Sequence, residues 1–317
     1  MDNLKKGILF GIICVILVGL EPIIANSRPS ELDAFIFAAM TVIIEAILFF
    51  PIMLVERRKI KSKHQLNVIS TEEMESLLYG YKNNRLLLLY IGITFGIAQI
   101  LFFIAYTLSG AINGSLSQKT TIIWALMFGF LINHEKITKT QIFFSGLLLL
   151  GLIIAVTQGS FDLLELNLGV ILMLITTMVW MLAHAFTKPV FDRKESTPIQ
   201  MVFIRNMIGG IILISIYFLI FPIKNVELFL KPINILFFIL MGIDYGISLY
   251  CWYKVLTYLG TSKGTAMVSG TPLITIVFAV LLLGENFTIF HLIGTGLVII
   301  SILMIVKPKK SEIKVES

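Results

Sequence analysis

The sequence predicts an all-α integral membrane protein whose ten transmembrane helices form two inverted five-helix repeats. Three observations support this prediction: the composition, a succession of long apolar runs, and a match of the chain with itself. Of the 317 residues, 57% are hydrophobic and only 14% are charged, and the mean hydropathy is +0.93. Soluble domains carry about 25% charged residues, so the composition favours a membrane protein.

Ten apolar runs are long enough to cross a bilayer, which takes about 20 residues. Backbone groups inside lipid must satisfy one another, and unbroken runs of this length exclude a β-barrel, so we expect helices. The first run, which follows Lys5 and Lys6, also resembles a signal peptide, but its removal would leave one repeat a helix short. The runs lie near residues 5–25, 33–55, 85–107, 111–132, 140–158, 166–187, 198–221, 232–257, 264–284 and 287–306.

The chain matches itself when it is shifted by 150 positions, so that the stretch Gly260–Glu285 falls on Gly110–Glu135. Five spans per unit is an odd number, so the second unit must lie upside down in the membrane. Inverted repeats of this kind are typical of secondary transporters. The expected units are residues 1–158, which include a cytoplasmic loop at 56–84, residues 159–306, and a cytoplasmic tail at 307–317. The matched pairs include Gly92/Gly242, Gly96/Gly246, Gly110/Gly260, Gly114/Gly264, Thr121/Thr271, Phe128/Phe278, Glu135/Glu285 and Gly146/Gly296.

The Lys and Arg residues between the spans predict the orientation. With both termini in the cytoplasm, the inner loops and tails hold 19 of the 25 basic residues and the outer loops hold three, as the positive-inside rule requires. Lys136 and Lys139 follow Glu135, whereas the matching residues after Glu285 are uncharged. We therefore expect a multi-pass protein of the plasma membrane.

The long polar loop 56–84 is expected to carry one short helix. Ser70, with Glu73 three residues later, resembles a capping box ahead of Leu77 and Leu78. A cytoplasmic surface helix is the simpler interpretation of this segment, and a regulatory or partner-docking element is the alternative.

The ninth span carries Gly270-Thr271-Pro272 near its start and a Gly284-Glu285 step at its end. Together with the two five-helix units, this piece resembles the drug/metabolite transporter superfamily, in its EamA-type branch, over nearly the whole chain. The resemblance implies efflux or uptake of small metabolites through a cavity lined mainly by helices 1, 3, 4, 6, 8 and 9. It implies no particular substrate.

The first copy departs from this pattern. Ile122 stands where Pro272 would be, and Asn133-His134-Glu135 replaces the Gly-Glu step. Arg205 also matches a familiar family position, but Ala38 replaces it in the first copy.

Lys119 is the first candidate for substrate binding, because it ends a polar run in mid-span that includes Gln118. Its counterpart is Ser269, which precedes Thr271 and Pro272. Pro272 removes a helix hydrogen bond, so we expect a helix kink whose free carbonyls line a wet cavity. Helices 4 and 9 would then face each other across the binding site. Alternatively, Lys119 only pairs with Glu45 or Asp244 and holds helices together.

Asp244 is the second candidate, since an acid followed by Tyr245 and other aromatic residues can hold an ammonium group. Tyr245 and Trp180 are therefore also expected to bind substrate, and packing is the simpler interpretation of these aromatic residues. A charged side chain within a bilayer is costly unless it is paired or hydrated. We therefore expect the remaining charged positions to form a coupling network, although His184 also fits a packing role. These positions are Glu21, Glu45, His184 and Arg205.

The buried acids outnumber the buried bases, so a spare carboxylate could take up a proton. Proton-coupled exchange and facilitated diffusion therefore both remain open. The expected partners are a small-molecule substrate, the lipid bilayer and possibly a second copy in a homodimer, with no nucleic acid.

No catalytic residues, metal site or cofactor are expected. Cys14 and Cys251 are isolated within apolar runs, and the four histidines are too far apart in the sequence for metal-ligand spacing. The chain has no Gly-rich phosphate loop, which argues against ATP-driven transport. A transporter is therefore preferred to an integral-membrane enzyme or a channel.

Overall fold

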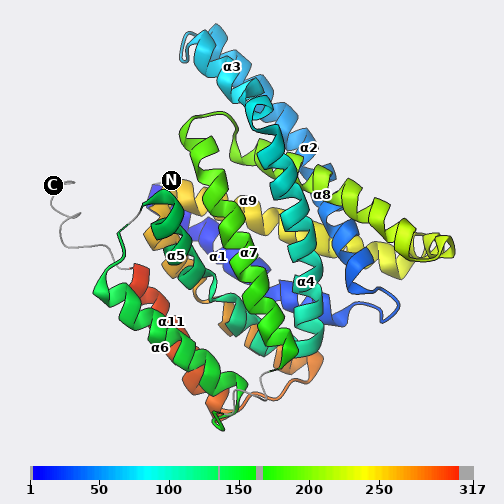
Figure 1. Cartoon of the computed structure of the whole chain (residues 1–317), viewed down its shortest axis with the longest axis vertical. Coiled ribbons are helices and arrows are strands. Elements are labelled where there is room, and N and C mark those ends of the chain that lie inside the picture. Colours follow the sequence, from blue (N-terminus) through cyan, green and yellow to red (C-terminus); the bar gives the residue numbers. More distant parts are fainter. Residues whose placement is uncertain (1–2, 135, 162–166, 307–317) are drawn as a thin grey trace.

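A computed structural model describes residues 3–134, 136–161 and 167–306 of the chain. Every regular element in these ranges is helical, and no strand occurs among them (Figure 1). The elements are α1 (Asn3–Ser27), α2 (Ala34–Gln65), α3 (Thr71–Tyr79), the 3-10 turn η1 (Gly80–Asn84), α4 (Arg85–Gln118), α5 (Thr121–Asn133), α6 (Lys139–Val156), α7 (Leu168–Asp192), α8 (Pro198–Ile220), the 3-10 segment η3 (Ile223–Phe229), α9 (Pro232–Val268), α10 (Thr271–Phe278), the π-helical turn η4 (Ala279–Leu283) and α11 (Ile289–Val306).

Eight helices in the described ranges are long and apolar enough to cross a membrane, judged by length and composition. Two shorter apolar helices, Thr121–Ile132 and Thr271–Leu283, each follow directly on a long one. The runs expected at 111–132 and 264–284 are therefore not single continuous helices. Each consists of the end of a long helix, a break, and a short helix.

The two breaks fall at equivalent positions of the 150-residue offset. Lys119 and Thr120 separate α4 from α5, and Ser269 and Gly270 separate α9 from α10. In both breaks a threonine hydroxyl donates to the carbonyl three residues before it: Thr120 Oγ1 to Ser117 (2.8 Å) and Thr271 Oγ1 to Val268 (2.6 Å). Such hydroxyls compete with the backbone donors of a continuous helix.

The position of Pro272 refines the expected kink. The helix ends before Gly270, and Pro272 lies in the first turn of α10. A proline there costs no intrahelical hydrogen bond, because the first N–H groups of a helix have no partner within it. Pro272 therefore favours a new helix start, and the break itself precedes it by two residues.

Glycines let several helices approach closely, because they carry no side chain to hold the backbones apart. A Cβ at Gly209 of α8 would lie 2.9 Å from the Gly92 carbonyl oxygen of α4. A Cβ at Gly294 of α11 would lie 2.4 Å from the Gly151 carbonyl oxygen of α6. α6 and α11 accordingly run side by side along one edge of the molecule (Figure 1).

The segment 56–84 is mostly helical, which corrects the expected loop. α2 continues past Val55 to Gln65, and α3 and η1 then return toward α4, so that this end projects from the bundle (Figure 1). The sequence prediction missed the extension of α2 because its residues are polar. The short helix was predicted correctly: Ser70 Oγ caps α3 by accepting from the Glu73 N–H at 3.1 Å.

The α3 segment is attached to the connection between α7 and α8. Lys194 pairs with Glu73 at 2.7 Å, and Glu195 accepts from Asn84 at 2.8 Å and from Arg193 at 2.9 Å. The hydrogen bonds from Arg193 and Asn84 lower the pKa of Glu195. This attachment joins the two halves of the chain at the end of the molecule that carries α3.

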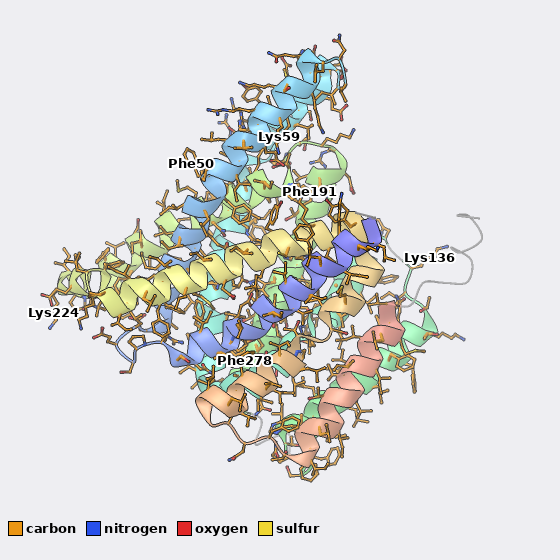
Figure 2. All side chains as sticks on the ribbon, turned by 180° about the vertical axis from the view of Figure 1, so that it is seen from behind. Phe50, Lys59, Lys136, Phe191, Lys224 and Phe278 are labelled. Carbon is orange, nitrogen blue, oxygen red and sulfur yellow. The ribbon has the colours of Figure 1, made fainter. Side chains whose placement is uncertain are left out.

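Basic side chains mark both ends of the bundle. Figure 2 shows Lys59 on the projecting part of α2, and Lys136 and Lys224 on opposite sides of the molecule.

Candidate functional site

The carboxylate of Glu285 binds the backbone of α4 across the two repeats. Oε1 accepts the Ala111 N–H at 2.6 Å, and Oε2 accepts the Ile112 N–H at 3.0 Å. Gly110 interrupts α4 with φ 77° and ψ 172°, so Ala111–Gln118 begins a new helical segment. The first N–H groups of such a segment lack helical partners and carry partial positive charge, which a carboxylate satisfies. We call this contact the Glu285 clamp.

The sequence analysis used Glu285 only as a marker of the repeat and missed this role. The sequence did contain a signal for this contact. An acid (Glu135 or Glu285) ends the same apolar run in both copies, and a glycine (Gly110 or Gly260) precedes that run. The equivalent Glu135 lies outside the described residues.

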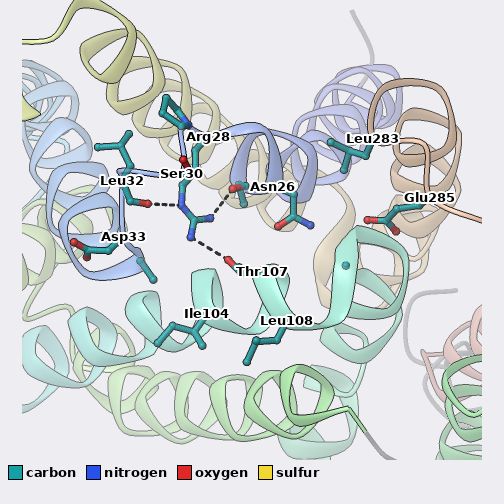
Figure 3. Close-up of a pocket in the computed structure, with 14 residues that line it drawn as sticks. Asn26, Arg28, Ser30, Leu32, Asp33, Ile104, Thr107, Leu108, Leu283 and Glu285 are labelled. Carbon is teal, nitrogen blue, oxygen red and sulfur yellow. Dashed lines mark hydrogen bonds between the residues drawn. The ribbon is translucent and has the colours of Figure 1, made fainter.

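A cavity of about 710 Å³ lies beside the Glu285 clamp, between the α1–α2 connection and α4 (Figure 3). Arg28 lines this cavity and is bonded to the protein on both sides of it. Nε donates to the Leu32 carbonyl at 2.9 Å, Nη2 donates to Thr107 Oγ1 at 3.0 Å, and Nη1 donates to the Ala25 carbonyl. All three guanidinium nitrogens are thus engaged by the protein. Arg28 therefore holds the connection in place, and we call the cavity the vestibule.

Charged groups from α1, α4 and α9 meet inside the bundle. Ser248 Oγ donates to Glu21 Oε1 at 3.2 Å, and Glu21 lies within electrostatic range of both Asp244 and Lys119. The exposed fractions are 3% for Glu21, 6% for Asp244 and 9% for Lys119. We call these four residues, Glu21, Lys119, Asp244 and Ser248, the central cluster.

Glu45 of α2 and Arg205 of α8 lie within electrostatic range of each other, and Glu45 Oε1 and Arg205 Nε have no hydrogen-bond partner among the described residues. Asn206 Nδ2 donates to Glu45 Oε2, and Arg205 interacts electrostatically with Glu45. The Arg205 guanidinium also lies 4.2 Å from the centre of the Phe95 ring, a cation–π distance. His184 packs edge-on against Phe95 at 5.1 Å, with its own side chain exposed.

Aromatic side chains surround Phe102 of α4. Its ring lies 4.7 Å from Tyr106, 5.3 Å from Trp180 and 6.2 Å from Tyr245. The Tyr106 hydroxyl lies within electrostatic range of Glu21, which places this aromatic group next to the central cluster.

Several buried polar atoms in the described part of the chain have no hydrogen-bond partner. Buried polar groups are normally satisfied, so a concentration of unpartnered ones indicates a place where water or a solute binds. Those near the central cluster, the aromatic group and the α4–α5 break are Asp244 Oδ2, Tyr106 OH, Trp180 Nε1 and Gln118 Oε1.

The residues predicted to bind substrate do not all lie together. Lys119 and Asp244 both lie within electrostatic range of Glu21, so the acid that acts on Lys119 is Glu21 rather than the expected Glu45 or Asp244. Gln118 and Ser269 are buried at the two breaks, and Thr271 is buried with its hydroxyl bonded to the backbone.

The expected juxtaposition of helices 4 and 9 takes the form of direct packing. Ile276 and Ala279 of the ninth span form one apolar cluster with Ala111 and Ile112 of the fourth. This contact adjoins the Glu285 clamp, so both interactions close the same end of the molecule. The sequence analysis did not single out Ser248 or Asn206, because serine and asparagine alone gave no signal of an acidic partner on another helix.

The helical fold, the eight membrane-length helices and the buried charges define a multi-pass integral membrane protein. The chain matches the EamA-like transporter family twice, over residues 5–157 and 167–307. It therefore belongs to that family.

Two relatives named as transporters agree with this assignment. An uncharacterized transporter of Methanothermobacter thermautotrophicus is 25% identical over 286 residues, which cover 88% of this chain and 80% of the relative. The uncharacterized transporter YyaM of Bacillus subtilis is 25% identical over 64% of this chain and 67% of its own length. One solved crystal structure superimposes with a TM-score of 0.59 at 12% identity, over 95% of this chain and 96% of that one, a likeness of fold alone.

Proposed function

We propose that this protein is a secondary transporter of small polar or amphipathic metabolites, which works by alternating access around the central cluster. One observation supports the proposal most strongly. Two apolar spans break at positions related by the 150-residue offset, and buried polar atoms without partners lie nearby. Discontinuous helices in the two halves of a transporter typically mark its binding site.

The proposal includes a topology of two inverted five-helix units in the plasma membrane, with both termini in the cytoplasm. The distribution of basic residues supports this orientation. The vestibule and the Glu285 clamp then lie on the outer side, and the clamp keeps that side closed. Opening it requires the Ala111–Gln118 segment to separate from Glu285, which exposes the central cluster to the outer vestibule.

Counterflow in proteoliposomes tests the proposal. Vesicles that contain the purified full-length protein are loaded with single metabolites from a panel and supplied with the same labelled compound outside. A carrier accumulates label transiently, with saturable kinetics and dependence on internal solute. Flux that does not saturate and shows no dependence on internal solute would contradict the carrier mechanism and favour a channel.

Lys119→Met tests whether the central cluster takes part. We expect the maximal rate of counterflow to fall at least about tenfold, because Glu21 loses its basic neighbour and a buried charge left without a partner is costly. Lys139→Met, which removes an exposed lysine at the start of α6, is the matched control and should transport normally. Unchanged kinetics in folded Lys119→Met protein would exclude Lys119 from the mechanism.

A further inference from the structure

The charges in the core of the described bundle do not balance. Glu45 interacts with Arg205 and accepts from Asn206, while Glu21 interacts with Lys119 and accepts from Ser248. Each of the two deeply buried basic side chains, Lys119 and Arg205, thus lies within electrostatic range of an acid other than Asp244. The third buried acid, Asp244, is left over.

Among the described residues, Asp244 acts electrostatically on Glu21 and on the Cys14 thiol, and its Oδ2 atom is buried without a hydrogen-bond partner. A buried carboxylate without a counter-ion is energetically costly, so the site is one positive charge short while Asp244 is ionised. An anionic solute would add to the imbalance, and a neutral solute would leave it in place.

The neighbourhood also indicates what kind of cation fits. Phe102, Tyr106 and Trp180 pack together beside the cluster, and the Tyr106 hydroxyl and the Trp180 indole N–H are buried without partners. Aromatic faces attract an ammonium group and bury an apolar body. A small inorganic cation would leave this aromatic surface unused.

We propose that the central cluster selects monovalent organic amines in their protonated form, with the ammonium at Asp244 and Glu21 and an apolar or aromatic body against Phe102, Tyr106 and Trp180. This inference rests on the proposed transport function and names the substrate class for the same site. Glu21 shares the ammonium with Asp244, while Lys119 brings the net charge of the central cluster with both carboxylates ionised to minus one, which a monovalent ammonium balances.

Ligand-dependent melting of the purified full-length protein tests the charge requirement without any variant, because binding raises the melting temperature by mass action. The probes are two amines, phenethylamine and hexylamine, with the neutral analogues 2-phenylethanol and 1-hexanol and the anions 3-phenylpropanoate and hexanoate. We expect the amines alone to raise the melting temperature. An equal or larger rise with the neutral or anionic probes, or no rise with either amine, would overturn the inference.

Asp244→Asn locates the site. Loss of an ionic hydrogen bond should weaken amine affinity about ten- to a hundredfold, while the melting temperature without ligand stays the same or rises, because an uncompensated buried charge is removed. Asp192→Asn makes the same change at an exposed position at the end of α7 and should bind amines like the wild type. Should Asp244→Asn fail to fold, Glu21→Gln serves as the second variant, with the same expected loss of affinity. Amine binding that survives in the folded variant would place the amine elsewhere and overturn the inference.

Counterflow separates this inference from the transport proposal. Saturable counterflow of phenethylamine that is lost in Asp244→Asn supports both. Saturable counterflow of a non-amine metabolite that amines do not inhibit would overturn the amine inference and leave the transport function standing. Flux of protons that depends on Asp244 but is insensitive to amines would identify the missing positive charge as a proton, and would likewise overturn the inference.

Discussion

Gly110 occupies a backbone conformation that only glycine adopts readily, and the Glu285 clamp depends on it. With φ 77° and ψ 172°, the chain turns so that the next two N–H groups point at the carboxylate. An added Cβ would also lie 3.1 Å from Glu285 Oε1. The conformation therefore serves an interaction between the two repeats.

Gly110→Ala should destabilise the protein by about 1–3 kcal/mol, the usual cost of a side chain in this region of backbone space. Thermal unfolding in detergent measures the effect as a fall in the melting temperature of several degrees. Gly146→Ala is the control, because a Cβ at Gly146 in α6 would meet nothing within 4 Å, and alanine in a helix interior is favoured over glycine. Equal melting temperatures for the two variants would show that the strained turn is not required.

Single residues of the candidate site were predictable from the sequence where they carry a charge within an apolar run. Lys119, Asp244 and Glu21 stood out because charges within apolar runs are rare, and the structure places them within electrostatic range of one another through Glu21. Their partners were not predictable. Ser248 is separated from Glu21 by 227 residues, and serine in an apolar helix usually bonds to its own backbone.

At the scale of elements, the Glu285 clamp acts on the short helical segment Ala111–Gln118. A carboxylate at a helix start neutralises free N–H groups and favours that helix, so the clamp both orders this segment and ties it to η4. The segment lies between the clamp and the break at Lys119. A change at Glu285 can therefore reach the central cluster through two helical turns.

Glu285→Gln should loosen this segment. The single amide oxygen can accept from one of the two N–H groups, while the amide NH₂ faces the other donor and repels it. We expect backbone amide exchange with deuterium across residues 111–118 to accelerate at least about tenfold, as measured by mass spectrometry of the folded protein. Glu31→Gln is the control: Glu31 accepts from Asn234 at 2.8 Å and pairs with Lys231, away from α4. Unchanged exchange in Glu285→Gln would show that the clamp does not hold the segment.

Hydropathy alone did not predict the break in either of the two spans. It located the apolar runs but treated 111–132 and 264–284 as continuous, since each is uniformly apolar apart from a few polar residues. Pro272 pointed to an irregularity in the second copy, but no proline stands at the matching position of the first copy, so the break after Gln118 was not predicted. The extension of α2 was not predicted, because the features that stabilise it do not raise hydropathy. These features are good helix-forming residues and contacts such as the hydrogen bond that Arg57 Nη1 donates to the Leu78 carbonyl at 2.9 Å.

For the whole molecule, the two repeats differ most in what they carry outside the bundle. The α3 segment belongs to the first repeat alone and is attached to the α7–α8 connection of the second by Glu73–Lys194 and Asn84–Glu195. The Glu285 clamp joins the repeats at the opposite end. Each end of the bundle thus has its own contact between the halves, so a rocking motion that opens one end can leave the other closed.

The inverted topology is the property on which the proposed mechanism depends, and it can be measured in cells. In a background with Cys14→Ala and Cys251→Ala, single cysteines replace Lys136 or Asn286, which directly follow Glu135 and Glu285 in the two copies and are exposed. We expect a membrane-impermeant maleimide to label Asn286→Cys in intact cells and Lys136→Cys only after permeabilisation. Lys224→Cys should be labelled in intact cells, like Asn286→Cys, and Lys59→Cys only after permeabilisation, like Lys136→Cys. Figure 2 shows Lys224 and Lys136 on opposite sides of the molecule and Lys59 on the projecting end of α2. If positions 136 and 286 react from the same side, the two halves are not inverted. The proposed alternating access around the α4–α5 and α9–α10 breaks, which depends on that inversion, is then excluded.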